Sequence, residues 1–141
     1  MKIGRIAFAC AMLAFAAMGL WPAVAQPAAG AYIFDILKKK PGMLKPWSAI
    51  VPGAYAGQRW IKRLEGTSGP VDRVTFSGKP FVLGSVCWPH NCGGNFVAFL
   101  IAEDGSEAYG LLRSSDLGAK DVPFGKLDAE KRKTLAAYLD R

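Results

Sequence analysis

Residues 81–113 read FVLGSVCWPHNCGGNFVAFLIAEDGSEAYGLLR, and this stretch decides the fold. Its middle, Phe96 to Ile101, is an almost unbroken apolar run, which is typical of a central strand that is covered on both faces. Asp104-Gly105 is a strong hairpin signal and predicts a return strand over Glu107 to Arg113. Phe81 to Val86 predicts a further strand before the cysteines, so the stretch is expected to fold as an antiparallel meander.

The flanking sequences add one more strand and several short helices. Val71 to Phe76 predicts a strand that enters the meander. Tyr32 to Leu37 and Trp60 to Leu64 have the spacing of short helices. Near the end of the chain, Asp128 can cap a closing helix. One face of that helix carries the apolar residues Leu135, Tyr138 and Leu139. The predicted fold class is α+β, an antiparallel sheet of about five strands flanked by short helices.

The first 25 residues are typical of a secretory signal peptide. A cationic start, Met1 to Arg5, precedes the apolar run Ile6 to Leu20, and Ala23-Val24-Ala25 fits the small-residue pattern that signal peptidase cleaves. A membrane span needs about 20 apolar residues, so the run is too short to be an anchor. We therefore expect export to the periplasm, no membrane span, and a single mature domain over residues 26–141.

The mature domain is basic, with 16 Lys and Arg residues against 11 Asp and Glu residues. Such an excess can indicate an anionic partner. The basic residues are scattered, however, and the local runs at Lys38 to Lys40 and Lys131 to Lys133 are not interleaved with aromatic residues as in a nucleic-acid groove. We interpret both runs as solvated helix faces and expect no nucleic-acid partner.

Cleavage would remove Cys10 and leave an even pair of cysteines, which predicts a disulfide in an exported protein. The bond would close a small ring between two strands, and the ring reads Cys87-Trp88-Pro89-His90-Asn91-Cys92. Closing a ring this short stabilises the fold by roughly 2 kcal/mol on the chain-entropy model. Its larger expected effect is to fix the shape of a protruding loop.

His90 is the one histidine of the sequence, and it lies inside this ring. Pro89 fixes its own φ and restricts the preceding residue, Trp88, so His90 is expected at the tip of a rigid projection. From the residues alone, a recognition loop and a plain stapled hairpin with an exposed histidine are equally acceptable.

Cys87, Cys92 and His90 do not form any of the common catalytic arrangements. A Cys–His nucleophile pair needs a free thiol, which the disulfide removes. The thioredoxin motif separates its cysteines by two residues rather than four, and one histidine with two cysteines gives at most three zinc ligands. No pair of carboxylates stands out as acid and base. We therefore predict a binding protein, not an enzyme, with no metal site and no cofactor.

The ring resembles the mark of the Ivy family, periplasmic inhibitors of vertebrate (c-type) lysozyme, in which a disulfide closes the loop C-K-P-H-D-C. Here Trp88 stands in the place of the lysine and Asn91 in the place of the aspartate. The resemblance covers most of the mature chain. Its supporting residues are Trp60 to Gly66 before the strands and Phe96 to Ile101 followed by Ala108 to Leu112.

The resemblance implies a c-type lysozyme as partner, with the loop inside the lysozyme cleft and His90 against the catalytic carboxylates. The implied binding residues are Trp88, Pro89, His90 and Asn91. Trp88 can stack in the sugar-binding cleft or lie back over the disulfide. The competing interpretation is a periplasmic binding module of the same fold for a bacterial lytic transglycosylase or an anionic envelope component. The sequence leaves open whether the chain forms a homodimer.

Overall fold

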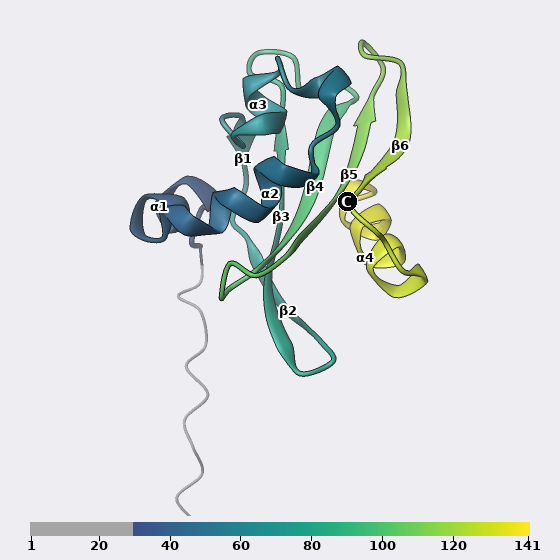
Figure 1. Ribbon diagram of the computed structural model, residues 1–141. Helices are drawn as coiled ribbons and strands as arrows, with labels where there is room; N and C mark the ends of the chain where they lie inside the picture. Colours follow the sequence, from purple (N-terminus) through teal and green to yellow (C-terminus); the bar gives the residue numbers. More distant parts are fainter. Residues whose placement is uncertain (1–29) are drawn as a thin grey trace, which may run out of the picture.

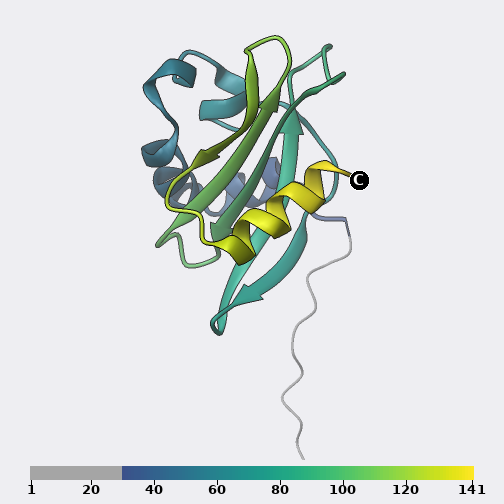
Figure 2. The same ribbon diagram turned by 90° about the vertical axis from the view of Figure 1, so that its right-hand side faces the viewer.

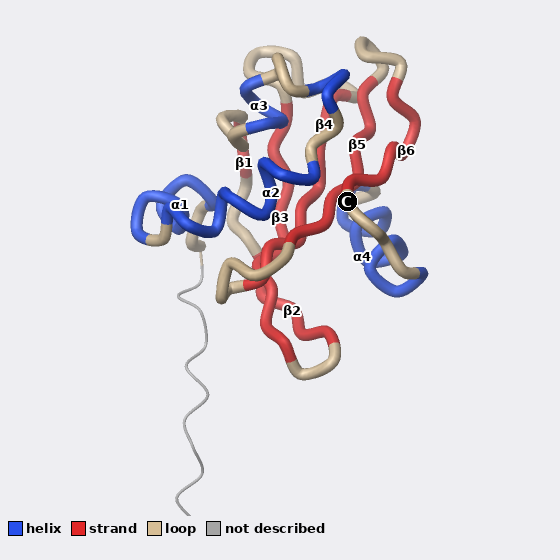
Figure 3. Tube along the Cα trace, in the orientation of Figure 1, coloured by secondary structure: helices blue, strands red, loops and turns tan. Residues whose placement is uncertain are grey.

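The computed structural model describes residues 30–141, and the predicted signal peptide, residues 1–25, lies outside them. A twisted sheet carries short helices on one face and a longer helix on the other (Figures 1 and 3). In chain order the elements are α1 (Ile33–Lys39), η1 (Pro41–Met43), α2 (Leu44–Ile50), η2 (Gly53–Tyr55), α3 (Arg59–Lys62), β1 (Thr67–Ser68), β2 (Asp72–Phe76), β3 (Lys79–Cys87), β4 (Asn95–Ala102), β5 (Ala108–Ser114), β6 (Ala119–Phe124) and α4 (Ala129–Leu139).

The sheet confirms the predicted α+β class and the antiparallel meander. Its strand order is β1-β3-β4-β5-β6, and β2 pairs with β3 on the same side as β1. Every pairing is antiparallel. β4, which contains the apolar run, is the central strand, and only Phe96 among its eight residues is not fully buried. This burial confirms the prediction of a strand that is covered on both faces.

Successive side chains of a strand point to opposite faces of the sheet, so the apolar residues form two clusters, one on each face. Phe99 belongs to the cluster under the helices α1 to α3, whereas the next residue, Leu100, belongs to the cluster under α4. Figure 2 shows α4 lying across its face of the sheet. Leu135 is fully buried there, and the Asp128 side chain accepts a hydrogen bond from the Lys131 amide at 2.8 Å. Both observations confirm the predicted closing helix.

Trp47 in α2 fastens the helical layer to the sheet. Its side chain is fully buried, and its Nε1 donates to the Ile61 carbonyl at 2.8 Å. The indole packs directly on β5 at Gly110, where a Cβ would lie only 2.7 Å from two ring carbons. A residue larger than glycine at position 110 would therefore push the helices off the sheet.

Three local features differ from the sequence prediction. The strand β6 was not predicted, because Pro123 and the charged residues in it break the apolar alternation; an edge strand tolerates such a proline. The two-residue strand β1 was also missed. The helix α3, predicted to reach Leu64, ends at Lys62, and the chain turns at Leu64 with a φ of 55°.

None of the helices in residues 30–141 has both the length and the apolar character that a membrane span requires.

Candidate functional site

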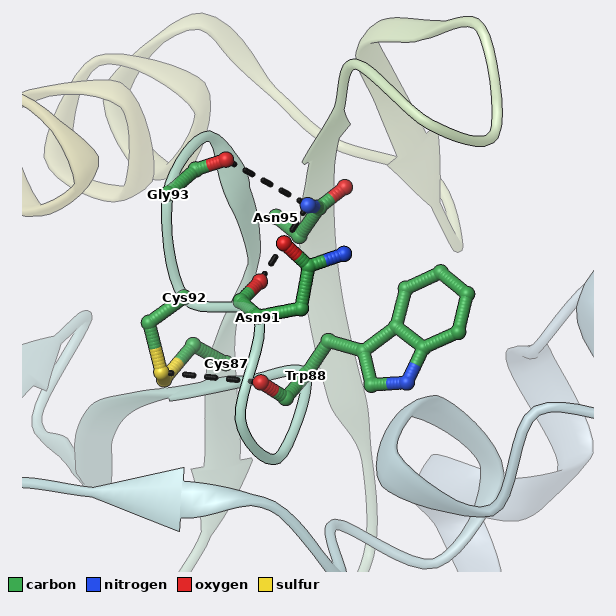
Figure 4. The surroundings of a disulfide bond; sticks show 6 residues. All are labelled: Cys87, Trp88, Asn91, Cys92, Gly93 and Asn95. Atoms are coloured by element: carbon green, nitrogen blue, oxygen red, sulfur yellow. Dashed lines mark hydrogen bonds between the residues drawn. A yellow bond between two sulfur atoms is a disulfide. The ribbon is translucent and has the colours of Figure 1, made fainter.

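The disulfide-closed loop joins the last residue of β3 to the first residue of β4. Cys87 and Cys92 are bonded, with their Cα atoms 5.0 Å apart, which confirms the predicted pairing. Inside the ring the Asn91 amide donates to the Trp88 carbonyl at 2.9 Å, and the Trp88 amide donates to the Asn95 carbonyl at 3.1 Å. The loop is thus a tight turn on top of a central hairpin (Figure 4).

The tip of the loop presents three consecutive exposed residues, Pro89, His90 and Asn91. His90 has a φ of 62°, a left-handed conformation that non-glycine residues adopt rarely and mostly in turns. The turn hydrogen bond and the disulfide on either side hold this backbone in place. The imidazole is therefore presented to solvent from a fixed backbone.

In the free protein Trp88 does not lie back over the disulfide, which was one of the two positions considered from the sequence (Figure 4). Its indole stacks on Trp60 of α3, with ring centroids 6.0 Å apart and planes 18° from parallel. Trp88 is partly buried and packs against the cluster under the helices. Figure 4 shows the indole pointing away from the two sulfur atoms. Trp88 thus anchors the loop to the fold, and it borders a groove lined also by Gln58, Arg59, Trp60, Glu65 and Pro89.

Asn95, which the sequence analysis did not single out, supports the loop from beneath. It is completely buried, and its Nδ2 donates to the carbonyl oxygens of Asn91 and Gly93 at 3.2 and 3.3 Å. Its Oδ1 accepts from the Ser114 hydroxyl at 2.6 Å and from the Asp116 amide at 3.4 Å. The sequence did contain a signal for this role, because Asn95 is a polar residue between the Gly93-Gly94 pair and an apolar strand.

The turn between β5 and β6 lies against the disulfide loop. The Ser115 amide donates to the Gly94 carbonyl at 3.0 Å, and the Asn91 Nδ2 donates to the Asp116 carboxylate at 2.6 Å. Asp116 is exposed, so its negative charge stands beside the tip. Two loops from different hairpins are therefore joined at Asn91, the residue that follows His90 in the tip.

We expect Asn95→Ala to lower the free energy of unfolding by about 2 kcal/mol, because the buried Ser114 hydroxyl would lose its acceptor and two loop carbonyls their donor. Urea denaturation of the purified protein measures the change. Asn91→Ala is the matched control, since it removes one exposed hydrogen bond, to Asp116, from the same loop, and its effect should stay within about 1 kcal/mol. Equal losses in the two variants would contradict the supporting role of Asn95.

Charges near the base of the loop are already paired. The Arg113 guanidinium contacts Asp121 through Nε and Nη2 at 2.7 and 3.1 Å, and Asp140 through Nη1 at 2.8 Å. These hydrogen bonds hold the pKa of Asp121 below its ordinary value and raise the pKa of Arg113. The cluster ties β5 and β6 to the end of α4, so its charges serve the fold.

The geometry of the loop suits binding. An exposed imidazole with an amide beside it can donate and accept hydrogen bonds in a partner's cleft. Within residues 30–141, no three His, Cys, Asp or Glu side chains come together in a way that could hold a metal ion. Of the four predicted binding residues, Pro89, His90 and Asn91 are exposed at the tip, whereas Trp88, at the start of the loop, is partly buried against Trp60 of α3.

Comparison with known families adds an independent finding. The family model described as "Inhibitor of vertebrate lysozyme (Ivy)" matches residues 42–129. The matched range runs from η1 to the first residue of α4 and so contains the whole meander, the disulfide loop and the β5–β6 turn.

Three curated relatives are similar to this chain. An "Inhibitor of vertebrate lysozyme" from Pseudomonas aeruginosa is 34% identical over 79 residues, which are 56% of this chain and 51% of the relative. Uncharacterized proteins from Yersinia pestis and Pseudomonas aeruginosa are each 30% identical, over 88 and 112 residues. Those alignments cover 62% and 79% of this chain, and 57% and 71% of the relatives. The matched part thus spans little more than half of the first two relatives.

Proposed function

Because the chain belongs to the Ivy family of inhibitors of vertebrate lysozyme, we propose that it binds a c-type lysozyme and occludes its active-site cleft with the loop that Cys87 and Cys92 close. The observation that carries the proposal is the exposed tip of this loop, where His90 projects from a backbone held by a disulfide and by Asn95. The family is named for inhibition, so no turnover is required of these residues.

The chemistry of the target explains why an imidazole is suited to this task. A lysozyme uses one protonated carboxylic acid and one ionised carboxylate on either side of the scissile sugar bond. A protonated imidazole between the two groups donates from both ring nitrogens, and it fills the space that the sugar bond needs. We infer that His90 takes this position and that Pro89 and Asn91 line the cleft on either side.

The fixed shape of the loop favours tight binding. Binding of a flexible loop costs about 0.5–1.5 kcal/mol for each side chain that must be immobilised. Here the disulfide, the turn hydrogen bond and the two donations from Asn95 impose the loop conformation before binding. Most of the free-energy cost of ordering the loop therefore arises on folding and not on binding.

The distribution of charge also supports docking on a basic lysozyme, although the mature domain itself is basic. Residues 31–63 hold seven basic residues and one acidic residue, whereas residues 64–141 hold nine basic and ten acidic residues. The loop belongs to the second, nearly neutral part, and Asp116 stands beside its tip. Repulsion at the contact surface is therefore much weaker than the net charge suggests.

The place of action follows from the same proposal. We propose that residues 1–25 direct export and are removed, so that residues 26–141 act in the periplasm. The competing partner, a lytic transglycosylase or an anionic envelope component in place of lysozyme, is not favoured by the family to which the chain belongs.

The direct test adds oxidised protein, residues 26–141, to a c-type lysozyme that is digesting bacterial cell walls. We expect inhibition that is complete near one inhibitor per enzyme, read as the rate of loss of turbidity. A bacterial lytic transglycosylase assayed in parallel serves as the control target. Undiminished lysozyme activity at a large excess of the protein would refute the proposal, and inhibition of the transglycosylase alone would favour the competing partner.

A further inference from the structure

The positive charge of the described chain is concentrated in the helical layer that covers one face of the sheet. That layer, residues 31–63, has an excess of six positive charges, and the remaining residues to 141 have an excess of one negative charge. Figure 1 shows α1 at one side of the molecule, away from α4 on the opposite face of the sheet. One side of the protein is therefore strongly positive, and the rest is nearly neutral.

Four lysines account for most of this excess, and they are free. Lys38, Lys39, Lys40 and Lys45 are exposed, and none of their side chains forms an ion pair or hydrogen bond within residues 30–141. The other cations of the layer are engaged: Arg59 and Arg63 pair with Glu65, and Lys62 donates to the Ser48 carbonyl. The four free lysines gather at the end of α1 and the start of α2.

An exposed aromatic residue lies beside these lysines. Phe34 is 58% exposed, and it is the one large hydrophobic residue classed as exposed among residues 30–141. It stacks on Tyr32 with ring centroids 5.4 Å apart, and it precedes Lys38 by one helical turn. Phe34 and Lys38 also line one groove, and its other lining residues are Leu37, Leu44, Arg63, Leu64, Glu65 and Gly66. Lys39 and Lys40 border another groove on the other side of α1, with Ile36 and Met43.

We propose that this α1 surface, formed by Tyr32, Phe34 and the four lysines, docks on the face of a lipid bilayer that contains anionic phospholipid. An exposed aromatic side chain among lysines is a combination that interfacial binding uses: the aromatic ring enters the headgroup region and the cations meet the phosphates. A purely electrostatic partner, such as an acidic soluble polymer, would give Phe34 no apolar environment.

The surface works in addition to the disulfide loop, because the two lie on different elements. The loop stands at the end of β3 and β4, and α1 lies beside the opposite part of the helical layer (Figure 1). A molecule docked through α1 keeps its loop free for a protein partner. The proposal does not depend on lysozyme binding, and it gives the Lys38 to Lys40 run a role beyond that of a solvated helix end.

Vesicle flotation with residues 26–141 tests the proposal. We expect binding to vesicles of phosphatidylcholine mixed with phosphatidylglycerol, none to phosphatidylcholine alone, and release as salt is raised. Each removed lysine should weaken binding about five-fold, so a variant with Lys38, Lys39, Lys40 and Lys45 all changed to Ala should lose about 600-fold. Phe34→Ser should lose about five-fold through reduced insertion.

The matched control removes the same charge from the other side of the molecule. Lys120, Lys126, Arg132 and Lys133 are exposed and form no side-chain ion pair or hydrogen bond within the described residues, and changing all four to Ala gives the same net charge as the first variant. This control should bind within about three-fold of the wild type. Circular dichroism establishes that all variants are folded.

Three results would overturn the proposal. Equal losses in the two quadruple variants would mean that only net charge matters. Equal binding to both kinds of vesicle would remove the role of anionic phospholipid. Binding to purified peptidoglycan that the first variant loses, without binding to vesicles, would assign the surface to a different envelope component.

Discussion

Replacing His90 by asparagine should weaken inhibition of c-type lysozyme at least ten-fold, with thermal stability nearly unchanged. The expected loss is about 1.5 kcal/mol, which corresponds to a charge-assisted hydrogen bond made in a desolvated site. Asparagine is the informative replacement because it tolerates the left-handed backbone that His90 adopts, at φ 62°, and it lacks the imidazole. Inhibition constants from titrations of lysozyme activity measure the effect.

A matched control for His90→Asn lies at the other end of β3, the strand that leads into the disulfide loop. Ser77, in the turn between β2 and β3, is also exposed and also left-handed, with a φ of 49°. Ser77→Asn should leave inhibition unchanged. If His90→Asn inhibits as well as the wild type does, the imidazole is not the group that fills the cleft, and the proposed role of His90 is wrong.

The double variant Cys87→Ser/Cys92→Ser should stay folded and bind lysozyme about ten- to one-hundred-fold more weakly. The sheet should survive because the ring is local and the two apolar clusters rest on strands such as β4. The freed loop contains Gly93 and Gly94 next to the tip, so its side chains must be ordered again on binding, at about 0.5–1.5 kcal/mol each. Circular dichroism and surface plasmon resonance measure the two effects.

Kinetics and a second variant make this prediction sharper. The loss should appear mainly in the dissociation rate, or as an association limited by loop conformation. Adding Asn95→Ala to the double variant should weaken binding further, because Asn95 is the second support of the same loop. An unfolded double variant would show that the bridge staples the whole domain, and unchanged binding would show that the loop does not contact the partner.

The sequence predicted the parts of the fold that depend on local pattern. The unbroken apolar run at Phe96 to Ile101 predicted the central strand, and two cysteines in a chain expected to be exported predicted the bond between them. β6 could not be predicted in this way, because an edge strand needs neither apolar alternation nor a donor at Pro123. Pairing with β5 makes that segment a strand, and pairing is not a local property.

The exposure of the loop tip was predicted from the sequence, and the residues that support the loop were not. Proline, histidine and asparagine inside a six-residue ring were expected to be exposed, and they are. The stacking of Trp88 on Trp60 joins residues that are 28 positions apart, and the hydrogen bonds of Asn95 reach Ser114 and Asp116 across the sheet. Contacts of this range depend on the strand order. The separation of charge between the helical layer and the sheet could not be predicted either, because it depends on residues 31–63 covering one face of the sheet.

The exposed tip, residues 89–91, contributes no side chain to either apolar cluster. Under the proposed function, mutations there would change what the protein recognises with little effect on whether it folds, whereas mutations of Trp88 or Asn95 would change both. Evolution can therefore vary the tip against a changing target at low cost in stability. For the same reason the β3–β4 hairpin is a ready scaffold for protein engineering, since short peptides of new sequence can be displayed between the two cysteines as inhibitors of other enzymes with deep clefts.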